Sequence, residues 1–114
     1  MADDCIFCRI GRGEIDTPLL FQDDRVFVVR DIRPKAPKHL LIIPKEHLTS
    51  LADMDLGKEA ILGHLLIVAR EMAKQEGVTR SGYRLVINQG PDSGQELAHL
   101  HLHLLAGRRL GAMG

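Results

Sequence analysis

The stretch AHLHLHLLAG, residues 98–107, alternates three histidines with leucines near the end of the chain. Successive side chains of a strand point to opposite faces, so His99, His101 and His103 would share one face. The leucines would share the other face, where they are explained as part of a core. The pattern therefore predicts a strand with one apolar face and one face of imidazole rings.

The histidine face has three competing explanations. A solvent-exposed polar face is one, although Thr, Lys or Glu would serve equally well. A metal ion held by all three rings is another, but positions i and i+4 lie about 13 Å apart at ~3.3 Å per residue. Bonds of about 2 Å to one ion cannot bridge that span. The third explanation makes the middle ring, His101, a nucleophile toward phosphorus, with its neighbours neutralising phosphate charge.

Working outward, the remaining patterns predict an α+β fold with a five-stranded, mostly antiparallel sheet. A short helix is expected at residues 4–10, with Asp4 as its cap and Gly11 at its end. Apolar runs bounded by turn residues predict the other strands. These four strands are residues 19–22, 25–30, 39–44 and 83–89.

One long helix is expected from Asp53 or Asp55 to Glu76, because Ser50 and Asp53 have capping-box spacing and a glycine follows its end. Its apolar residues cover more than one stripe. Either the helix packs on the sheet and also meets a partner subunit, or it is simply well buried. These residues are Ile61, Leu62, Leu65, Leu66, Val68, Ala69 and Met72.

Composition narrows the functional class. With 114 residues, a single domain spanning residues 1–114 is expected. Fifteen basic and fifteen acidic side chains cancel, so neither nucleic acid nor a membrane surface is expected as a partner. No apolar run has the length of a membrane helix, and the acidic opening MADD is unlike a secretory signal. We therefore expect a cytoplasmic protein that handles any phosphate in a local site.

The two cysteines, Cys5 and Cys8, form one CxxC pair. In a reducing compartment such a pair indicates a metal half-site or a redox motif more than a structural disulfide.

Four blocks together resemble one known family over nearly the whole chain. HLHLHLL, within the last block, fits the signature of the histidine triad (HIT) superfamily of nucleotide hydrolases and transferases. The four blocks resemble the Hint branch of that superfamily, the purine nucleoside phosphoramidases, and specifically its bacterial members. They are CIFCRI, LLFQDDRVFVVRDIRPKAPKHLLIIPKEH, GYRLVINQGPDSGQE and HLHLHLLAGRRL.

The resemblance implies a role for each polar site residue. His101 would attack the α-phosphorus and carry a covalent nucleotidyl intermediate, which water then hydrolyses to a nucleoside monophosphate. His103 and Asn88 would hold α-phosphate oxygens. His39 would help to position the triad, and Asp31 would accept hydrogen bonds from the ribose hydroxyls.

The resemblance also implies a base slot and a leaving-group loop. Gly94 and Gln95 would approach the phosphate and leaving group. Glu96 replaces the serine of animal members, and it either helps as a general acid or is a plain surface residue. The apolar slot for the base would consist of Ile6, Phe7, Ile10, Phe27 and Ile32.

A structural zinc ion on Cys5, Cys8, His47 and His99 is implied by similar bacterial proteins, and the reaction itself should need no cofactor. The alternative is two reduced cysteines and a His99 that only orients the triad. His64 has no motif context and is expected at the surface or in a dimer interface.

The resemblance also implies a homodimer, in which the sheets of the two chains form one continuous ten-stranded sheet. Its expected reaction is hydrolysis of the P–N bond of purine nucleoside 5′-phosphoramidates. One alternative is a dinucleoside polyphosphate hydrolase of the Fhit-like branch. The other is a nucleotide-binding regulator without catalytic activity.

Overall fold

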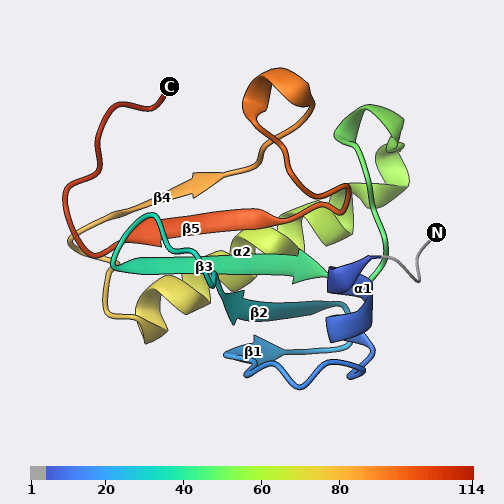
Figure 1. Ribbon diagram of the computed structural model, residues 1–114, viewed down its shortest axis with the longest axis horizontal. Coiled ribbons are helices and arrows are strands. Elements are labelled where there is room, and N and C mark those ends of the chain that lie inside the picture. Colours follow the sequence, from blue (N-terminus) through green and yellow to red (C-terminus); the bar gives the residue numbers. More distant parts are fainter. Residues whose placement is uncertain (1–4) are drawn as a thin grey trace.

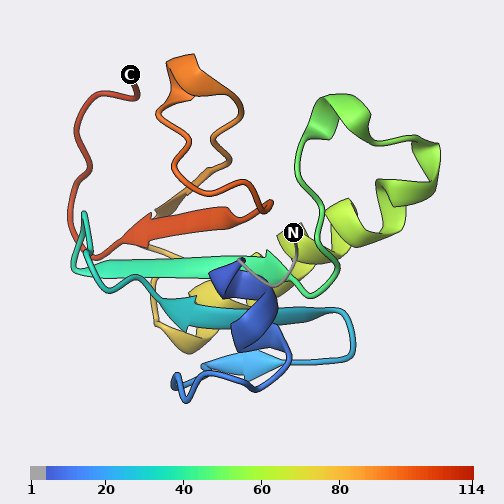
Figure 2. The ribbon, with the colours of Figure 1, turned by 45° about the vertical axis from the view of Figure 1, so that its right-hand side comes forward.

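Five antiparallel strands form one sheet in the order β1-β2-β3-β5-β4. The computed structural model describes residues 5–114. A long helix crosses one face of the sheet, and a short helix lies against the other (Figures 1 and 2). The expected α+β class, with five strands and one long helix, is confirmed. The strands are β1 (Phe21–Gln22), β2 (Val26–Arg30), β3 (Lys38–Pro44), β4 (Tyr83–Val86) and β5 (Leu102–Ala106), and the helices are α1 (Ile6–Gly11) and α2 (Glu59–Gln75).

The face beneath α2 holds the larger apolar core. The leucines of the histidine-rich stretch, Leu100, Leu102 and Leu104, are buried there, as the alternation predicted. They pack with residues of β2, β3 and the inner side of α2, whereas Leu66 and Ile67 on the outer side of α2 are exposed. The apolar surface of α2 is thus divided between a buried face and an exposed one.

The opposite face carries a smaller apolar cluster under α1. Phe7 and Ile10 of α1 are buried against residues of β2 and β3 that point away from α2. The strand residues of this cluster are Phe27, Val29, Leu41 and Ile43. The triad histidines also lie on this side of the sheet, and Phe7 of α1 contacts the rings of His99 and His101.

The ladder of β5 begins later than the sequence predicted, because the chain bends at Ala98 and His99 before it enters the sheet. The Leu100 N–H donates to the Leu48 carbonyl at 2.6 Å instead of to a neighbouring strand. Alternation of buried leucines and histidines nevertheless continues through the bend. The expected strand at 98–107 is therefore corrected to residues 102–106.

The long helix begins at Glu59, later than either predicted start. The Ser50 hydroxyl accepts from the Ala52 N–H and begins a 3₁₀ turn, η2 (Leu51–Asp53). The Asp55 carboxylate accepts from the Gly57 N–H and begins another, η3 (Leu56–Lys58). Ser50 is therefore a cap, as predicted, and Asp55, predicted only as a possible start of the helix, is another, but each caps a short turn before α2. The end near Glu76 is as predicted, with Gly77 at a φ of 73°.

Helix α1 differs from the prediction at its end, and the predicted cap Asp4 lies outside the described residues. Cys5 is the N-cap: its sulfur accepts from the Cys8 N–H at 3.3 Å. Gly11 is the last helical residue, and the left-handed turn that follows is made by Gly13, at a φ of 76°. A remaining 3₁₀ turn, η4 (Pro91–Ser93), lies in the loop between β4 and β5. No helix among residues 5–114 is long and apolar enough to cross a membrane.

An ion-pair cluster joins the end of α2 to the sheet. The Glu76 carboxylate is 6% exposed and accepts from both Arg30 guanidinium nitrogens, at 2.9 and 3.0 Å. Lys38 lies 3.3 Å from the same carboxylate. The hydrogen bonds from Arg30 outweigh burial and hold the pKa of Glu76 below its ordinary value.

We expect Glu76→Gln to lower the free energy of unfolding at pH 7 by about 1 kcal/mol, because Arg30 is half exposed and water screens the pair. A lowered folded-state pKa gives stability that is present above the unfolded pKa and lost as the pH falls through the folded value. Urea unfolding between pH 7 and pH 3 should therefore show a smaller acid loss in the variant. Glu59→Gln, which removes an exposed carboxylate at the other end of α2, is the matched control; an acid dependence identical in wild type and Glu76→Gln would contradict the assignment.

Candidate active site

A hydrogen-bonded row of polar residues crosses the open face of the sheet at the ends of β2, β3 and β5. The Lys35 backbone N–H donates to His39 Nδ1 at 3.1 Å, so this nitrogen carries a lone pair. In the neutral ring the proton is then on Nε2, which lies 2.9 Å from His103 Nδ1 and 3.5 Å from Asp31 Oδ2. His39 thus donates to His103 and holds that ring in one tautomer.

The consequence for His103 is an N–H directed into the site. With its Nδ1 accepting from His39, the proton of the neutral His103 ring is on Nε2, 3.5 Å from the Asn88 amide nitrogen. Two donors aimed at one space suit an anionic oxygen bound beside both. Burial, and next the neighbouring His101, lower the pKa of His103 to about 4, and burial also lowers the pKa of His39. Both rings are therefore neutral at pH 7, as the hydrogen-bond assignment requires.

His101 has the opposite tautomer to His103. Its Nδ1 lies 2.7 Å from the backbone carbonyl of His99, and since a carbonyl only accepts, the proton of the neutral ring is on Nδ1. Nε2 then keeps a free lone pair. The ring is 8% exposed, and its centroid lies 4.9 Å from that of His103. A fixed ring with one free nitrogen beside two donors is the arrangement that nucleophilic attack on phosphorus requires.

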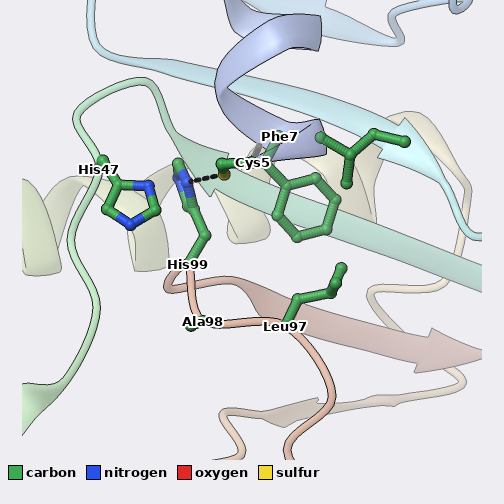
Figure 3. Close-up of a pocket in the computed structure, with 7 residues that line it drawn as sticks. Cys5, Phe7, His47, Leu97, Ala98 and His99 are labelled. Carbon is green, nitrogen blue, oxygen red and sulfur yellow. Dashed lines mark hydrogen bonds between the residues drawn. The ribbon is translucent and has the colours of Figure 1, made fainter. Parts of the chain in front are cut away.

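His99 points away from this group and into a second cluster, where α1 meets the loop after β3 (Figure 3). Its Nε2 donates to the Pro44 carbonyl at 2.8 Å, which leaves the Nδ1 lone pair 3.1 Å from Cys5 Sγ. His47 Nδ1 lies 3.1 Å from Cys8 Sγ. A cavity of about 280 Å³ opens beside these residues and is also lined by Ile6, Phe7, Leu97 and Ala98.

The Cys5, Cys8, His47 and His99 cluster fits a tetrahedral zinc ion. Its four ligand atoms lie within 4.8 Å of one another, and the His99 lone pair already faces the sulfurs. Burial, and next a hydrogen bond that the Cys8 S–H donates to Cys5, raise the pKa of Cys8 to about 11, so without a cation this thiol stays protonated. A bound zinc ion would instead stabilise its thiolate.

The Asp31, His39 and His103 group is equally close-set but does not fit a metal ion. Because the Lys35 N–H occupies His39 Nδ1, His39 Nε2 carries a proton and offers no lone pair. A proton, not a cation, therefore links these three residues. The two close groups have distinct chemistry, one relaying a hydrogen bond and the other offering sulfur and nitrogen ligands.

The residues expected to form the base slot differ widely in exposure. Ile6 is 47% exposed at the cavity beside the cysteines, whereas Ile32 is 91% exposed on the loop after β2. Phe7 is buried against His99 and His101, and Ile10 is buried in the cluster under α1. Phe27 has no exposed surface and belongs to the same cluster.

The loop expected to approach the leaving group lies between β4 and β5. The Gln95 side chain serves the loop itself, accepting from the Gly90 N–H at 2.8 Å and donating to the Leu97 carbonyl at 3.1 Å. Gly94 has a φ of 83° and ends the turn η4. Glu96 is exposed.

Sequence reasoning missed the groups that orient the rings. The Lys35 N–H and the Pro44 and His99 carbonyls are backbone atoms, and backbone atoms leave no residue signature. It also missed Leu41, which pairs with His103 in the sheet register and with Val29 on its other side. The alternation of β2 could have predicted Val29 on this face of the sheet. Successive odd positions of a strand share a face, so Val29 lies on the same face as Phe27 and two residues nearer to Asp31.

Comparison with known proteins decides the family. A family model described as HIT domain matches residues 12–110. The chain belongs to the HIT domain family. The expected HIT hydrolase is thereby confirmed at the level of family and enzyme class.

Relatives of this HIT protein match it over nearly their full length. The purine nucleoside phosphoramidase of Escherichia coli K12 is 45% identical over 113 residues, covering 99% of this chain and 95% of the relative. A 14 kDa zinc-binding protein of Zea mays is 48% identical over 107 residues, covering 92% and 83%. The crystal structure of a HIT family hydrolase from Legionella pneumophila matches with a TM-score of 0.91 and 46% identity, covering 94% of this chain and 96% of that one.

Proposed function

We propose that this HIT protein hydrolyses the P–N bond of purine nucleoside 5′-phosphoramidates through a nucleotidyl intermediate on His101. The observation that carries the proposal is that the two neighbouring imidazole rings have different tautomers. His101 keeps its Nε2 lone pair, while His103 directs an N–H toward the same site. The E. coli relative named purine nucleoside phosphoramidase supports the choice of substrate class.

The reaction proceeds in two displacements. His101 Nε2 forms a bond to the α-phosphorus as the P–N bond breaks, and the departing amine takes a proton from solvent or from Glu96. Water then attacks the phosphorus and loses a proton to solvent, the N–P bond to His101 breaks, and a nucleoside monophosphate leaves. His103 Nε2–H and the Asn88 amide stabilise the charge on the phosphoryl oxygens in both steps.

The rest of the nucleotide would lie along the ends of β2 and β3. The Asp31 carboxylate, which also accepts from the Arg33 N–H at 2.8 Å, would accept hydrogen bonds from the ribose hydroxyls. Ile32, exposed one residue further on, would close over the base from the loop side. Gly94 and Gln95 would reach the phosphate and leaving group from the loop between β4 and β5.

A kinetic comparison tests this substrate class. We expect kcat/KM for adenosine or guanosine 5′-phosphoramidate to exceed that for diadenosine polyphosphates by at least about 100-fold, because a site discriminates through contacts made in the transition state. The reverse preference would indicate the dinucleoside polyphosphate hydrolase. Tight AMP binding without turnover of either substrate would indicate a nucleotide-binding regulator.

We also propose that Cys5, Cys8, His47 and His99 hold a structural zinc ion, and that the protein resides in the cytoplasm, where thiols remain reduced. The Zea mays zinc-binding relative and the fit of the four ligand atoms support this. Elemental analysis of purified protein should give about one zinc per chain, and Cys5→Ser should lose most of it. Less than about a tenth of an ion per chain in the unmutated protein would contradict the proposal.

A homodimer with a continuous ten-stranded sheet is the last part of the proposal. Within residues 5–114, β4 is an edge strand paired only with β5, and Leu66 and Ile67 are exposed on α2. We expect sedimentation velocity to give the mass of two chains, and Leu66→Asp to give that of one, because a charge in an apolar interface is costly to bury. A monomeric wild-type protein at micromolar concentration would contradict it.

A further inference from the structure

The Cys/His cluster and the proposed nucleophile share one residue, His99. Its side chain belongs to the cluster, with Nδ1 3.1 Å from Cys5 Sγ and Nε2 bonded to the Pro44 carbonyl at 2.8 Å. Its backbone carbonyl accepts the Nδ1–H of His101 at 2.7 Å. Fixing the His99 side chain at both nitrogens therefore also fixes the acceptor that orients His101.

Phe7 makes a second connection between the same groups. It lies between Cys5 and Cys8 in the sequence, so any restraint on the two sulfurs also restrains its backbone. Its ring is buried and meets His99 edge-on, with centroids 5.6 Å apart, and His101 at 5.2 Å. Aromatic contacts of this kind are directional, so Phe7 limits the tilt of the His101 ring.

We propose that the Cys5, Cys8, His47 and His99 cluster positions the His101 ring, and that Phe7 is a positioning residue that acts between the cluster and that ring. The inference rests on the proposed function, in which His101 is the nucleophile. The cluster holds the His99 carbonyl and the Phe7 ring against His101, and together they keep the Nε2 lone pair aimed at phosphorus. Zinc, when bound, would stiffen the cluster, but the contacts to His101 are made by residues of the chain itself.

Phe7→Leu separates this role from a place in the base slot. Leucine keeps an apolar side chain but loses the ring edge, so kcat for adenosine 5′-phosphoramidate should fall about tenfold while KM stays within about twofold. Cys8→Ser should act in the same direction, with a loss of about 10–100-fold, the range typical of removing a supporting residue. A rise in KM at unchanged kcat in Phe7→Leu would overturn the proposal and return Phe7 to base binding.

The matched control is Arg9→Lys, on the exposed side of the same helix, which should keep kcat and KM. AMP affinity measured by calorimetry should also stay within about threefold in Phe7→Leu, since only nucleophile geometry changes. A parallel loss of AMP affinity and kcat would show general damage to the site and would contradict a positioning role.

A readout without turnover keeps this test independent of the proposed reaction. In ¹⁵N-labelled protein, the His101 Nδ1–H should give a sharp, slowly exchanging imidazole signal, because it is buried and bonded to the His99 carbonyl. Phe7→Leu, Cys8→Ser and chelation of any bound metal should each shift or broaden that signal, whereas Arg9→Lys should not. If no phosphoramidate is turned over but these changes occur, the proposed function fails and the coupling stands; a signal unchanged in all three cases overturns the coupling.

Discussion

Replacing His101 with alanine is expected to lower kcat for purine nucleoside 5′-phosphoramidates by at least about 10⁴-fold. The reason is that this ring keeps a lone pair on Nε2, facing the proposed phosphate site, and loss of a nucleophile generally removes most of an enzyme's rate enhancement. Steady-state kinetics with a fluorogenic amine as the leaving group would measure the loss. AMP binding should persist, because the donors from His103 and Asn88 remain.

The matched control for His101→Ala is His64→Ala. His64 lies on α2, where its ring pairs with Asp23 at 2.7 Å, and α2 covers the face of the sheet opposite the triad. This variant should keep kcat within about twofold, since it touches no site residue. Turnover above about a tenth of wild type in His101→Ala would remove the ring from the nucleophilic role.

Leu104→Ala is expected to have the largest effect on stability, about 2–5 kcal/mol in the free energy of unfolding. Leu104 is fully buried in the interior strand β5, paired with Leu40 on one side and Leu85 on the other. Truncation leaves a cavity beneath α2 that the sheet cannot close. Urea or guanidinium denaturation of purified protein would measure it.

Leu56→Ala is the control for that loss, because Leu56 is 83% exposed and should cost less than about 0.5 kcal/mol. His103→Ala, next to Leu104 but on the other face, should instead lower kcat by about 100-fold or more through loss of a phosphate donor. A loss below about 1 kcal/mol for Leu104→Ala would contradict the division of the strand into a core face and a chemical face.

Sequence periodicity predicted the architecture because one face of each element is apolar, and that signal is local. It predicted the alternation of His99, His101 and His103 with buried leucines. It also predicted the order of the strands and helices along the chain. Element boundaries were less predictable. Ser50 and Asp55 cap short turns instead of α2, and whether a cap begins a turn or a long helix depends on later packing.

The candidate site was predictable as a set of residues but not as an arrangement. Residue types and the family resemblance placed His39, Asp31 and Asn88 near the triad, and the structure brings them together with His103. Tautomers depend on backbone partners, which only the fold supplies. The full burial of Phe27 was not predictable for a related reason: pattern gives the face of a strand, but not how deeply each residue lies below the surface.

The most direct test of the account is to identify the residue that carries the nucleotide. Wild-type protein would be mixed with excess adenosine 5′-phosphoramidate, quenched under alkaline conditions that preserve phosphoramidate bonds to histidine, and mapped by mass spectrometry. We expect at most one adenylyl group per chain, on His101, and none in His101→Ala. An adduct on His99 or His103, or turnover by the wild-type protein with no adduct at any time after mixing, would contradict it.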